Sequence, residues 1–240
     1  MEMAAICSRC SVFGKVRARG LILNRMKIAA TASSANFFIL SSASLIIRTA
    51  MSTSTCERNI ENVWDYPRPA ILEPIDDEVR IVFNGVEVVR TKNAMRVLET
   101  SHPPTYYVPM DEISGSVQLS QVSGSGSYCE WKGRAVYFDL TAHGKTSARA
   151  AWAYPHPTTK VNPHQNHGWA NYGKGSASGV GGSFAPLKDM VAFYATRVDE
   201  CYVAGERARP QDGGFYGGWI NSWISGGERG IKGAPGTSFF

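Results

Sequence analysis

The sequence predicts a mainly β protein, and three observations support this fold class. Residues 79–90 read VRIVFNGVEVVR, in which Asn84-Gly85 separates two runs rich in β-branched residues. Further runs of aromatic and β-branched residues are short and are bounded by Gly, Pro or Ser, as strands usually are. The chain shows no repeat, no coiled-coil pattern and no apolar stretch long enough for a transmembrane helix. A single domain of short strands is therefore predicted.

The clearest local element is a β-hairpin around Asn84-Gly85. Asparagine and glycine tolerate the positive φ angles of a type I′ turn, which matches the twist of paired strands. Pairing Phe83 with Val86 and Ile81 with Val88 would place four apolar side chains on one face of the hairpin. One face of this hairpin is therefore expected to be buried.

The remaining elements are predicted as strands with one short helical turn. Residues 94–99 are compatible with a strand or with one helical turn, and we favour the strand. Residues 106–109 read as a strand that a proline ends, and residues 110–113 as a helical turn. Residues 123–127, SGSGS, are predicted as a loop. Later strands are predicted at 135–140, 149–154, 190–197 and 200–206.

The folded domain is predicted to span residues 57–209, with a Gly-rich insertion loop at 158–183. The tail, residues 210–240, is rich in Gly and Trp and has little periodicity. We expect the tail to pack back onto the domain through Phe215, Trp219 and Trp223. The sequence does not predict an oligomeric state.

Residues 1–56 form a leader that is not expected to belong to the fold. The leader holds seven Lys and Arg and one acid, Glu2, and it is rich in Ser and Ala. This composition is typical of a transit peptide for a plastid or a mitochondrion. Residues 37–47 are too short to span a bilayer, but they are long enough for the core of a secretory signal. A disordered leader, with a cytoplasmic protein that begins at Met51, is the third interpretation.

The net charge of +5 comes from the leader, because residues 57–240 hold 18 basic and 19 acidic residues. A protein that binds nucleic acid usually carries a basic patch that meets the phosphates. The folded part lacks the charge balance for such a patch. The sequence therefore predicts no nucleic-acid partner and no membrane span.

One stretch, Leu98–Pro109, combines groups that can do chemistry within a stiff segment. It reads LETSHPPTYYVP and contains Glu99, His102 and Tyr106 around two consecutive prolines. Proline fixes its own φ and pushes the preceding residue into an extended conformation, so His102 is not expected to be helical. The stretch is therefore a candidate site held by a rigid backbone.

Two further segments have a similar density of functional groups. Residues 128–133, YCEWKG, place Cys129, Trp131 and Lys132 just before a predicted strand. Residues 151–157, AWAYPHP, end another strand with Trp152 and Tyr154 on one face. A structural interpretation stays open for each, since Cys is often a small buried residue and Trp and Tyr are often core residues.

A metal site is not predicted. His164-x-x-His167 has a ligand-like spacing, but it lies in the Gly-rich insertion without a Cys or carboxylate nearby. Cys7-x-x-Cys10 lies in the leader and has no second pair. The sequence also has no Gly-x-Ser-x-Gly elbow, no P-loop and no dinucleotide fingerprint. No cofactor is assigned.

The chain resembles the family called domain of unknown function 427. The motifs that carry the resemblance are, in order, LETSHPPTYY, CEWKG with VYFDL behind it, AAWAYPHP and VAFYATRVDECYVAGE. The tail segments FYGGW and KGAPGT are similar to longer members. The resemblance implies a β-tent-like domain of two antiparallel sheets, as in methionine sulfoxide reductase B-like domains. Many such relatives bind zinc through two Cys-x-x-Cys pairs, which this domain lacks.

The resemblance implies no established activity, although some members carry a nucleotidyltransferase label. That chemistry normally uses clustered carboxylates, and Asp76-Asp77-Glu78 is the only cluster in the sequence. The hypothesis is that acid/base groups and aromatic groups from the matching segments form one pocket. Its members are Glu99, His102, Cys129 and Lys132 as catalytic groups, and Tyr106, Trp131, Trp152 and Tyr154 as ligand-binding groups.

Two functions are compatible with such a pocket. It could belong to a small-molecule-binding or enzymatic domain, with Glu99 or His102 as general base and Lys132 as partner of an anion. It could instead belong to a non-catalytic binding module that grips a peptide or a cyclic ligand. A structural role, in which these residues satisfy one another in a core, stays open beside both.

Overall fold

The computed structural model describes residues 58–159 and 183–236. The predictions for the leader, for the histidines at 164 and 167 and for most of the Gly-rich insertion lie outside these residues. In the part of the chain that the structure describes, no helix has the length and apolarity needed to cross a bilayer. The tail belongs to the same compact unit as the domain, residues 58–240.

The described chain consists of short strands and four 3₁₀ turns. The strands are β1 (Glu61–Asn62), β2 (Ile71–Pro74), β3 (Val79–Phe83), β4 (Val86–Thr91), β5 (Met95–Glu99), β6 (His102–Pro109), β7 (Val117–Cys129), β8 (Gly133–Ala142), β9 (Lys145–Ala153), β10 (Met190–Phe193), β11 (Glu200–Val203), β12 (Glu206–Arg207), β13 (Arg209–Pro210), β14 (Trp219–Ile220) and β15 (Ile224–Ser225). The 3₁₀ turns are η1 (Val63–Asp65), η2 (Met110–Glu112), η4 (Ala185–Leu187) and η5 (Gly227–Arg229). The predicted mainly β fold is therefore confirmed.

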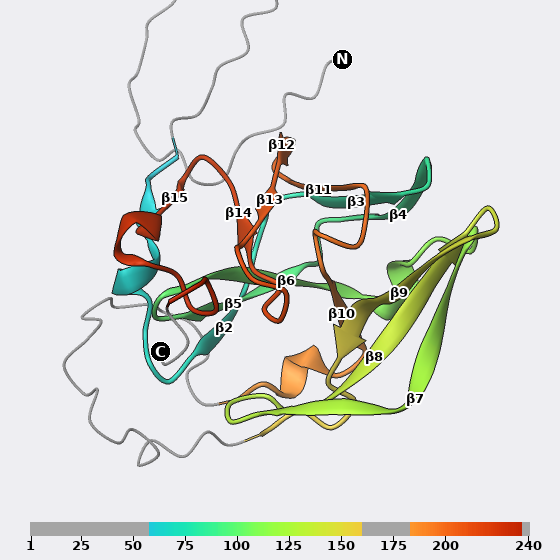
Figure 1. Cartoon of the computed structure of the whole chain (residues 1–240), viewed down its shortest axis with the longest axis horizontal. Helices are drawn as coiled ribbons and strands as arrows, with labels where there is room; N and C mark the ends of the chain where they lie inside the picture. The colour runs from blue at the N-terminus through green and yellow to red at the C-terminus, as the bar shows by residue number, and fades with distance from the viewer. Residues whose placement is uncertain (1–57, 160–182, 237–240) are drawn as a thin grey trace, which may run out of the picture. The chain divides into compact units, whose positions relative to one another are not determined.

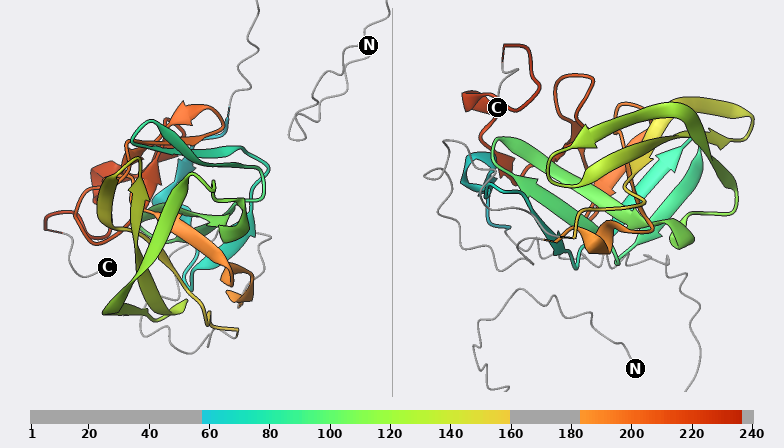
Figure 2. Two further views of the ribbon diagram at one scale, coloured as in Figure 1. Left: turned by 90° about the vertical axis from the view of Figure 1, so that its right-hand side faces the viewer. Right: turned by 90° about the horizontal axis from the view of Figure 1, so that it is seen from below.

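Two antiparallel sheets carry the fold (Figure 1). The larger sheet has seven strands in the order β2-β5-β6-β10-β9-β8-β7, and the smaller has four in the order β12-β11-β3-β4. Two small pairs, β1 with β15 and β13 with β14, attach the tail. Figure 2 shows the long β7–β8–β9 meander, coloured green to yellow, from two further sides.

Buried residues lie on both faces of the seven-stranded sheet and belong to two different clusters. One face meets the four-stranded sheet and the tail in a core that contains Tyr106, Val108, Phe83 and Trp219. The other face forms a second cluster that is rich in aromatic residues and includes Tyr107. Successive residues of a strand point to opposite faces, which is why neighbours in β6 belong to different clusters.

The predicted hairpin is present, with a different register. Asn84 and Gly85 both have positive φ, 49° and 72°, as a type I′ turn requires. Phe83 pairs with Val86 as predicted, but Ile81 pairs with Val89 rather than Val88. A β-bulge in β4 causes this shift, because β4 has one more residue than β3 between these pairs.

Residues 123–127 are not a loop but part of the edge strand β7. The register of β7 against β8 jumps from Gln121↔Phe138 to Gly126↔Val136, so the SGSGS segment is a wide irregularity inside a paired strand. The small polar residues do interrupt the regular pairing, but β7 pairs with β8 on both sides of them. The strands predicted at 190–197 and 200–206 are shorter than expected and end at Phe193 and Val203.

Candidate functional site

A cavity of about 330 Å³ opens on the aromatic face of the seven-stranded sheet. Seven of the eight predicted site residues form part of its walls, and Tyr106 does not. The walls contain Glu99, His102, Thr105, Tyr107, Ser127, Tyr128, Cys129, Glu130, Trp131, Lys132, Tyr137, Trp152, Tyr154, Phe215, Tyr216, Gly217 and Lys232. This volume is within the range of small-molecule sites.

A β-bulge at Pro103–Pro104 places the acid and the imidazole on the cavity face. Val97 of β5 pairs with Thr105 of β6, and Glu99 pairs with His102. Between these two pairs β6 therefore has one more residue than β5. Without the extra residue, alternation would turn His102 away from the face that Thr105 occupies. The consecutive prolines suit this position, because proline donates no hydrogen bond to a ladder and is tolerated at bulges.

The turn between β5 and β6 is fixed by the N-terminal arm of the domain. Ser101 adopts a left-handed conformation with φ 63°. Its N–H donates to the carbonyl of Val63 at 2.9 Å, and the Thr100 hydroxyl donates to the carbonyl of Tyr66 at 2.6 Å. Glu99 and His102 therefore project from a rigid two-residue turn.

Aromatic side chains form a row across four strands on the same face. Tyr107 in β6 lies opposite Ala192 in β10, since Val108 pairs with Val191. Ala192 pairs with Trp152 in β9, which in turn pairs with Tyr137 in β8. Because alanine is small, the rings of Tyr107 and Trp152 approach each other across it, with their centroids 6.3 Å apart, and Tyr107, Trp152 and Tyr137 all belong to the cavity walls.

Tyr106 is placed in the core, not at the cavity. Its ring lies 5.2 Å from the ring of Trp219, on the face that meets the tail. Tyr107 occupies the position that the sequence analysis gave to Tyr106. The two tyrosines are neighbours in β6, and because side chains alternate between the two faces of a sheet, a shift of one residue moves the side chain to the opposite face.

Glu99 is buried and ionised. Its Oε1 accepts a hydrogen bond from Lys232 Nζ at 2.6 Å, and Arg68 Nη1 lies 3.8 Å from the same oxygen. Burial by itself raises the pKa of Glu99, but the positive charges of Lys232 and Lys132, the hydrogen bond from Lys232, and His102 once it is protonated at low pH outweigh it and hold the pKa at about 2. Glu99 is therefore a fixed negative charge at neutral pH.

His102 is buried and neutral, with one nitrogen engaged. Its Nδ1 lies 2.5 Å from the carbonyl oxygen of Pro103, and a carbonyl only accepts, so Nδ1 carries the proton. Burial is the main cause that lowers the pKa of His102 to about 4; Lys132 and Lys232 lower it further, and Glu99 opposes them. At neutral pH, Nε2 therefore keeps its lone pair.

We expect His102 to make folding stability fall as the pH drops from about 6.5 towards 4. In this interval the unfolded chain binds a proton at His102 and the folded protein does not, so protons favour unfolding. Urea unfolding measured across this interval should give a flatter profile for His102→Asn than for the wild type. Equal slopes for the two proteins would contradict the lowered pKa.

Lys132 is buried without a carboxylate partner. It lies in the β7–β8 turn, is 9% exposed, and forms no salt bridge with any carboxylate in the part of the chain described here. Its ammonium has only the weak Cys129 thiol acceptor and the Tyr154 ring, whose centroid is 5.8 Å from Nζ. Burial lowers the pKa of Lys132, but Tyr107, Cys129 and Glu99 raise it more, so the side chain stays charged.

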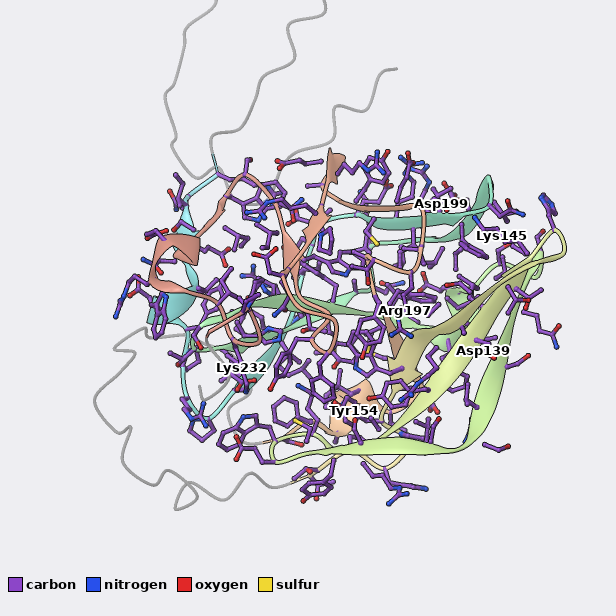
Figure 3. All side chains as sticks on the ribbon, in the orientation of Figure 1. Asp139, Lys145, Tyr154, Arg197, Asp199 and Lys232 are labelled. Atoms are coloured by element: carbon purple, nitrogen blue, oxygen red, sulfur yellow. The ribbon has the colours of Figure 1, made fainter. Side chains whose placement is uncertain are left out.

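The tail supplies one wall of the cavity, and Gln211 holds it there. Gln211 is 2% exposed; its Oε1 accepts from Gly218 N at 2.7 Å and its Nε2 donates to the carbonyl of Lys232 at 2.8 Å. Lys232 N donates to the carbonyl of Ser101 at 2.8 Å. These hydrogen bonds fix the backbone of Lys232 in a position from which its side chain reaches Glu99. Figure 3 labels Lys232 in the tail and Tyr154 just after β9.

Two glycines let the tail approach the cavity closely. A Cβ at Gly217 would overlap the indole of Trp152, and a Cβ at Gly233 would overlap the ring of Tyr216. Gly233 also has a φ of +87°, which disfavours other residues. The tail contributions Phe215, Tyr216 and Lys232 were missed as site residues, although FYGGW and KGAPGT contain them.

Chemically, the site combines one neutral imidazole, one unpaired ammonium, one neutralised carboxylate and aromatic walls. Across residues 58–159 and 183–236, no three His, Cys, Asp or Glu side chains come close enough to hold a metal ion. His156, the histidine that follows Tyr154 and Pro155, is exposed and does not belong to the cavity walls.

Comparison with known proteins identifies one family. Residues 71–173 match the family model described as "Domain of unknown function (DUF427)". No curated protein matches the chain. The matched stretch contains all eight predicted site residues but not the tail wall with Tyr216 and Lys232. The resemblance carried by LETSHPPTYY, by CEWKG with VYFDL and by AAWAYPHP is thus confirmed, because residues 71–173 match the domain of unknown function 427 family.

Proposed function

We propose that the cavity binds a small organic anion with a planar body, and that Lys132 is its charged partner. The observation that carries this proposal is the buried ammonium of Lys132 without a carboxylate partner among the described residues. An ammonium removed from water and left unpaired costs free energy, so natural proteins keep such groups mainly at functional sites. An anion in the cavity would remove this cost.

The balance of charged side chains around the cavity supports an anionic ligand. Glu99 is neutralised by Lys232 at 2.6 Å. Glu130, at the rim, is paired with Arg68 at 3.3 Å. His102 is neutral at neutral pH. Once Glu99 is paired with Lys232 and Glu130 with Arg68, the ammonium of Lys132 is the positive charge in the described cavity walls that no carboxylate balances.

Two more donors in the walls lack partners. The indole N–H of Trp131 and the hydroxyl of Tyr107 are fully enclosed and have no partner at normal hydrogen-bond distance, although Trp152 and Tyr154 lie beside the Tyr107 hydroxyl. A buried donor without an acceptor costs roughly 1–3 kcal/mol, so such groups need an explanation. Small movements of the walls would let both groups donate to the oxygens of a bound anion.

The walls and the rim favour a planar body for the ligand. Trp152, Tyr107 and Tyr154 lie in one cluster, with ring centroids of Tyr107 and Trp152 6.3 Å apart. Tyr128 and Phe215 belong to the cavity walls and are 79% and 63% exposed, so their rings are available to a ligand at the rim. Aromatic rings bind flat ligands through stacked and edge-on contacts.

Two other interpretations have less support. Nucleotidyl transfer would need clustered carboxylates, and the described carboxylates at the cavity are Glu99 and Glu130, both already paired. A module that grips a peptide would leave Lys132 unexplained. For the fold, the two antiparallel sheets support the β-tent architecture that the family resemblance implies.

The proposal is tested by calorimetric titration of the protein with benzoate and phenyl phosphate, with benzamide as the neutral ligand of similar shape. We expect at least one anion to bind and benzamide to bind roughly tenfold more weakly or not at all, because a hydrogen bond to a charged group contributes about 1.5–3 kcal/mol. Lys132→Met should lose the preference for the anion. Urea unfolding of this variant checks that it stays folded, so that the change in affinity reports on the charge.

Lys188→Met is the matched control, because Lys188 is exposed and lies outside the cavity walls. It should bind the anion as the wild type does. Absence of binding for both anions, or equal affinity for benzoate and benzamide, would overturn the proposed function.

A further inference from the structure

We infer that the cavity is a catalytic site for proton abstraction, in which His102 Nε2 takes a proton from a bound carbon acid and Lys132 stabilises the oxyanion that forms. This inference rests on the proposed function, since it needs a molecule held in the same cavity. Carbon acid here means a molecule with a C–H bond next to a carbonyl or an equivalent acceptor. The groups that carry the inference are His102, Lys132 and Glu99.

The orientation of His102 leaves one nitrogen available. Nδ1 donates to the carbonyl of Pro103 at 2.5 Å, which fixes the tautomer and the ring. Nε2 has no hydrogen-bond partner in the described part of the chain, and it is not among the polar atoms that are fully enclosed. His102 belongs to the cavity wall, and its ring meets the edge of Tyr216 with centroids 5.3 Å apart. The unprotonated nitrogen is therefore accessible from the cavity.

The charges around His102 come from three separate elements and have distinct roles. Glu99 lies directly across the β5–β6 ladder and stabilises a positive imidazolium. Lys132 from the β7–β8 turn and Lys232 from the tail disfavour it. An anion bound to Lys132 would cancel part of this repulsion and raise the basicity of His102. The base would thus strengthen when the cavity is occupied.

The proposed step balances without a cofactor. The C–H bond of the substrate breaks, the proton moves to Nε2, and the electron pair moves to the acceptor oxygen to form an enolate. Lys132 donates hydrogen bonds to this oxygen and keeps its own proton. The imidazolium then returns the proton to the same carbon or to a neighbouring one, so the reaction class is racemisation or isomerisation.

The test uses 5-nitrobenzisoxazole, a planar probe for general bases in cavities. A base that removes its ring C–H proton causes the N–O bond to break, and the product is a coloured cyano-nitrophenolate whose charge develops on oxygen. The wild type should accelerate this reaction above buffer, and benzoate should inhibit competitively. The pH profile of kcat/KM should rise near pH 4 rather than near 6.5, following the lowered pKa of His102.

His102→Asn should lower kcat/KM by tenfold or more, since general-base catalysis contributes roughly 10²–10⁴-fold in enzymes. Asparagine can still donate to the Pro103 carbonyl from the position of Nδ1, so the fold should be kept. His143→Asn is the matched control: His143 is exposed in the β8–β9 turn, and its φ of 46° is one that asparagine tolerates. This variant should retain the wild-type rate.

The outcomes separate the two proposals. If benzoate binds but wild type and His102→Asn convert the probe at equal rates, the base is refuted and the anion site stands. If neither benzoate nor phenyl phosphate binds, the proposed function fails as well. A wild-type rate no higher than that of the buffer, although benzoate binds, would also overturn the inference, because the bound probe would then meet no base in the cavity.

Discussion

Replacing Glu99 with glutamine is expected to lower the free energy of unfolding by about 3 kcal/mol, the scale for breaking one side of a buried ion pair. The Glu99 and Lys232 side chains are 7% and 13% exposed, and their charged atoms lie 2.6 Å apart. Glutamine keeps the shape but leaves Lys232 without a counter-charge. For a domain of this size the melting temperature should fall by roughly 6–12 °C.

Glu130→Gln is the control, because it removes the same charge at the rim of the same cavity. Glu130 pairs with Arg68 at 3.3 Å, but its side chain is 48% exposed, and such pairs contribute between about 0 and 1 kcal/mol. A double-mutant cycle isolates the buried pair: Lys232→Met should cost much less in the Glu99→Gln background than in the wild type. Additive losses in the cycle would show that the two side chains do not interact.

The Glu99 ion pair also defines an acid limit of stability. The pKa of Glu99 is held at about 2, below its ordinary value of 4.5. Its contribution to stability is therefore complete above about 4.5 and is lost as the pH falls towards 2. In Glu99→Gln this acid-dependent loss should disappear, while the separate loss due to His102 at higher pH remains.

Much of the cavity could be predicted from the sequence because its residues lie in short, motif-dense segments. Cys129, Trp131 and Lys132 lie in one turn, and Trp152 and Tyr154 lie at one strand end. Such clusters stay together whatever the register of the strands. This explains why seven of the eight predicted residues share the cavity.

The remaining features depend on register and on distant contacts. The choice between Tyr106 and Tyr107 depends on the face each residue takes, and the bulge at Pro103–Pro104 changes the count by one. Lys232 is 133 residues from its partner Glu99, and no local pattern links them. The glycine- and tryptophan-rich tail has little periodicity, so its role as a wall follows from close packing rather than from secondary structure.

Trp219→Ala is expected to have the largest effect on stability, because Trp219 holds the tail against the sheet. It is 1% exposed, its ring packs on Tyr106, and its indole N–H donates to the carbonyl of Phe193 at 3.0 Å. Truncation of a buried tryptophan costs roughly 3–5 kcal/mol, and the Phe193 carbonyl would also lose its partner. The melting temperature should fall by roughly 6–20 °C.

The same substitution should weaken anion binding, although Trp219 lies on the opposite face of the sheet from the cavity. Loosening of the tail would displace Tyr216 and Lys232, and Glu99 would then lack its partner and repel an anion near Lys132. Phe215→Ala is the control in the same tail, because its side chain is 63% exposed and should change stability by less than about 0.5 kcal/mol. If Trp219→Ala were destabilised but bound benzoate with wild-type affinity, the tail would be a structural brace and not a wall of the site. Equal melting temperatures for the two variants would show that the tail does not stabilise the domain.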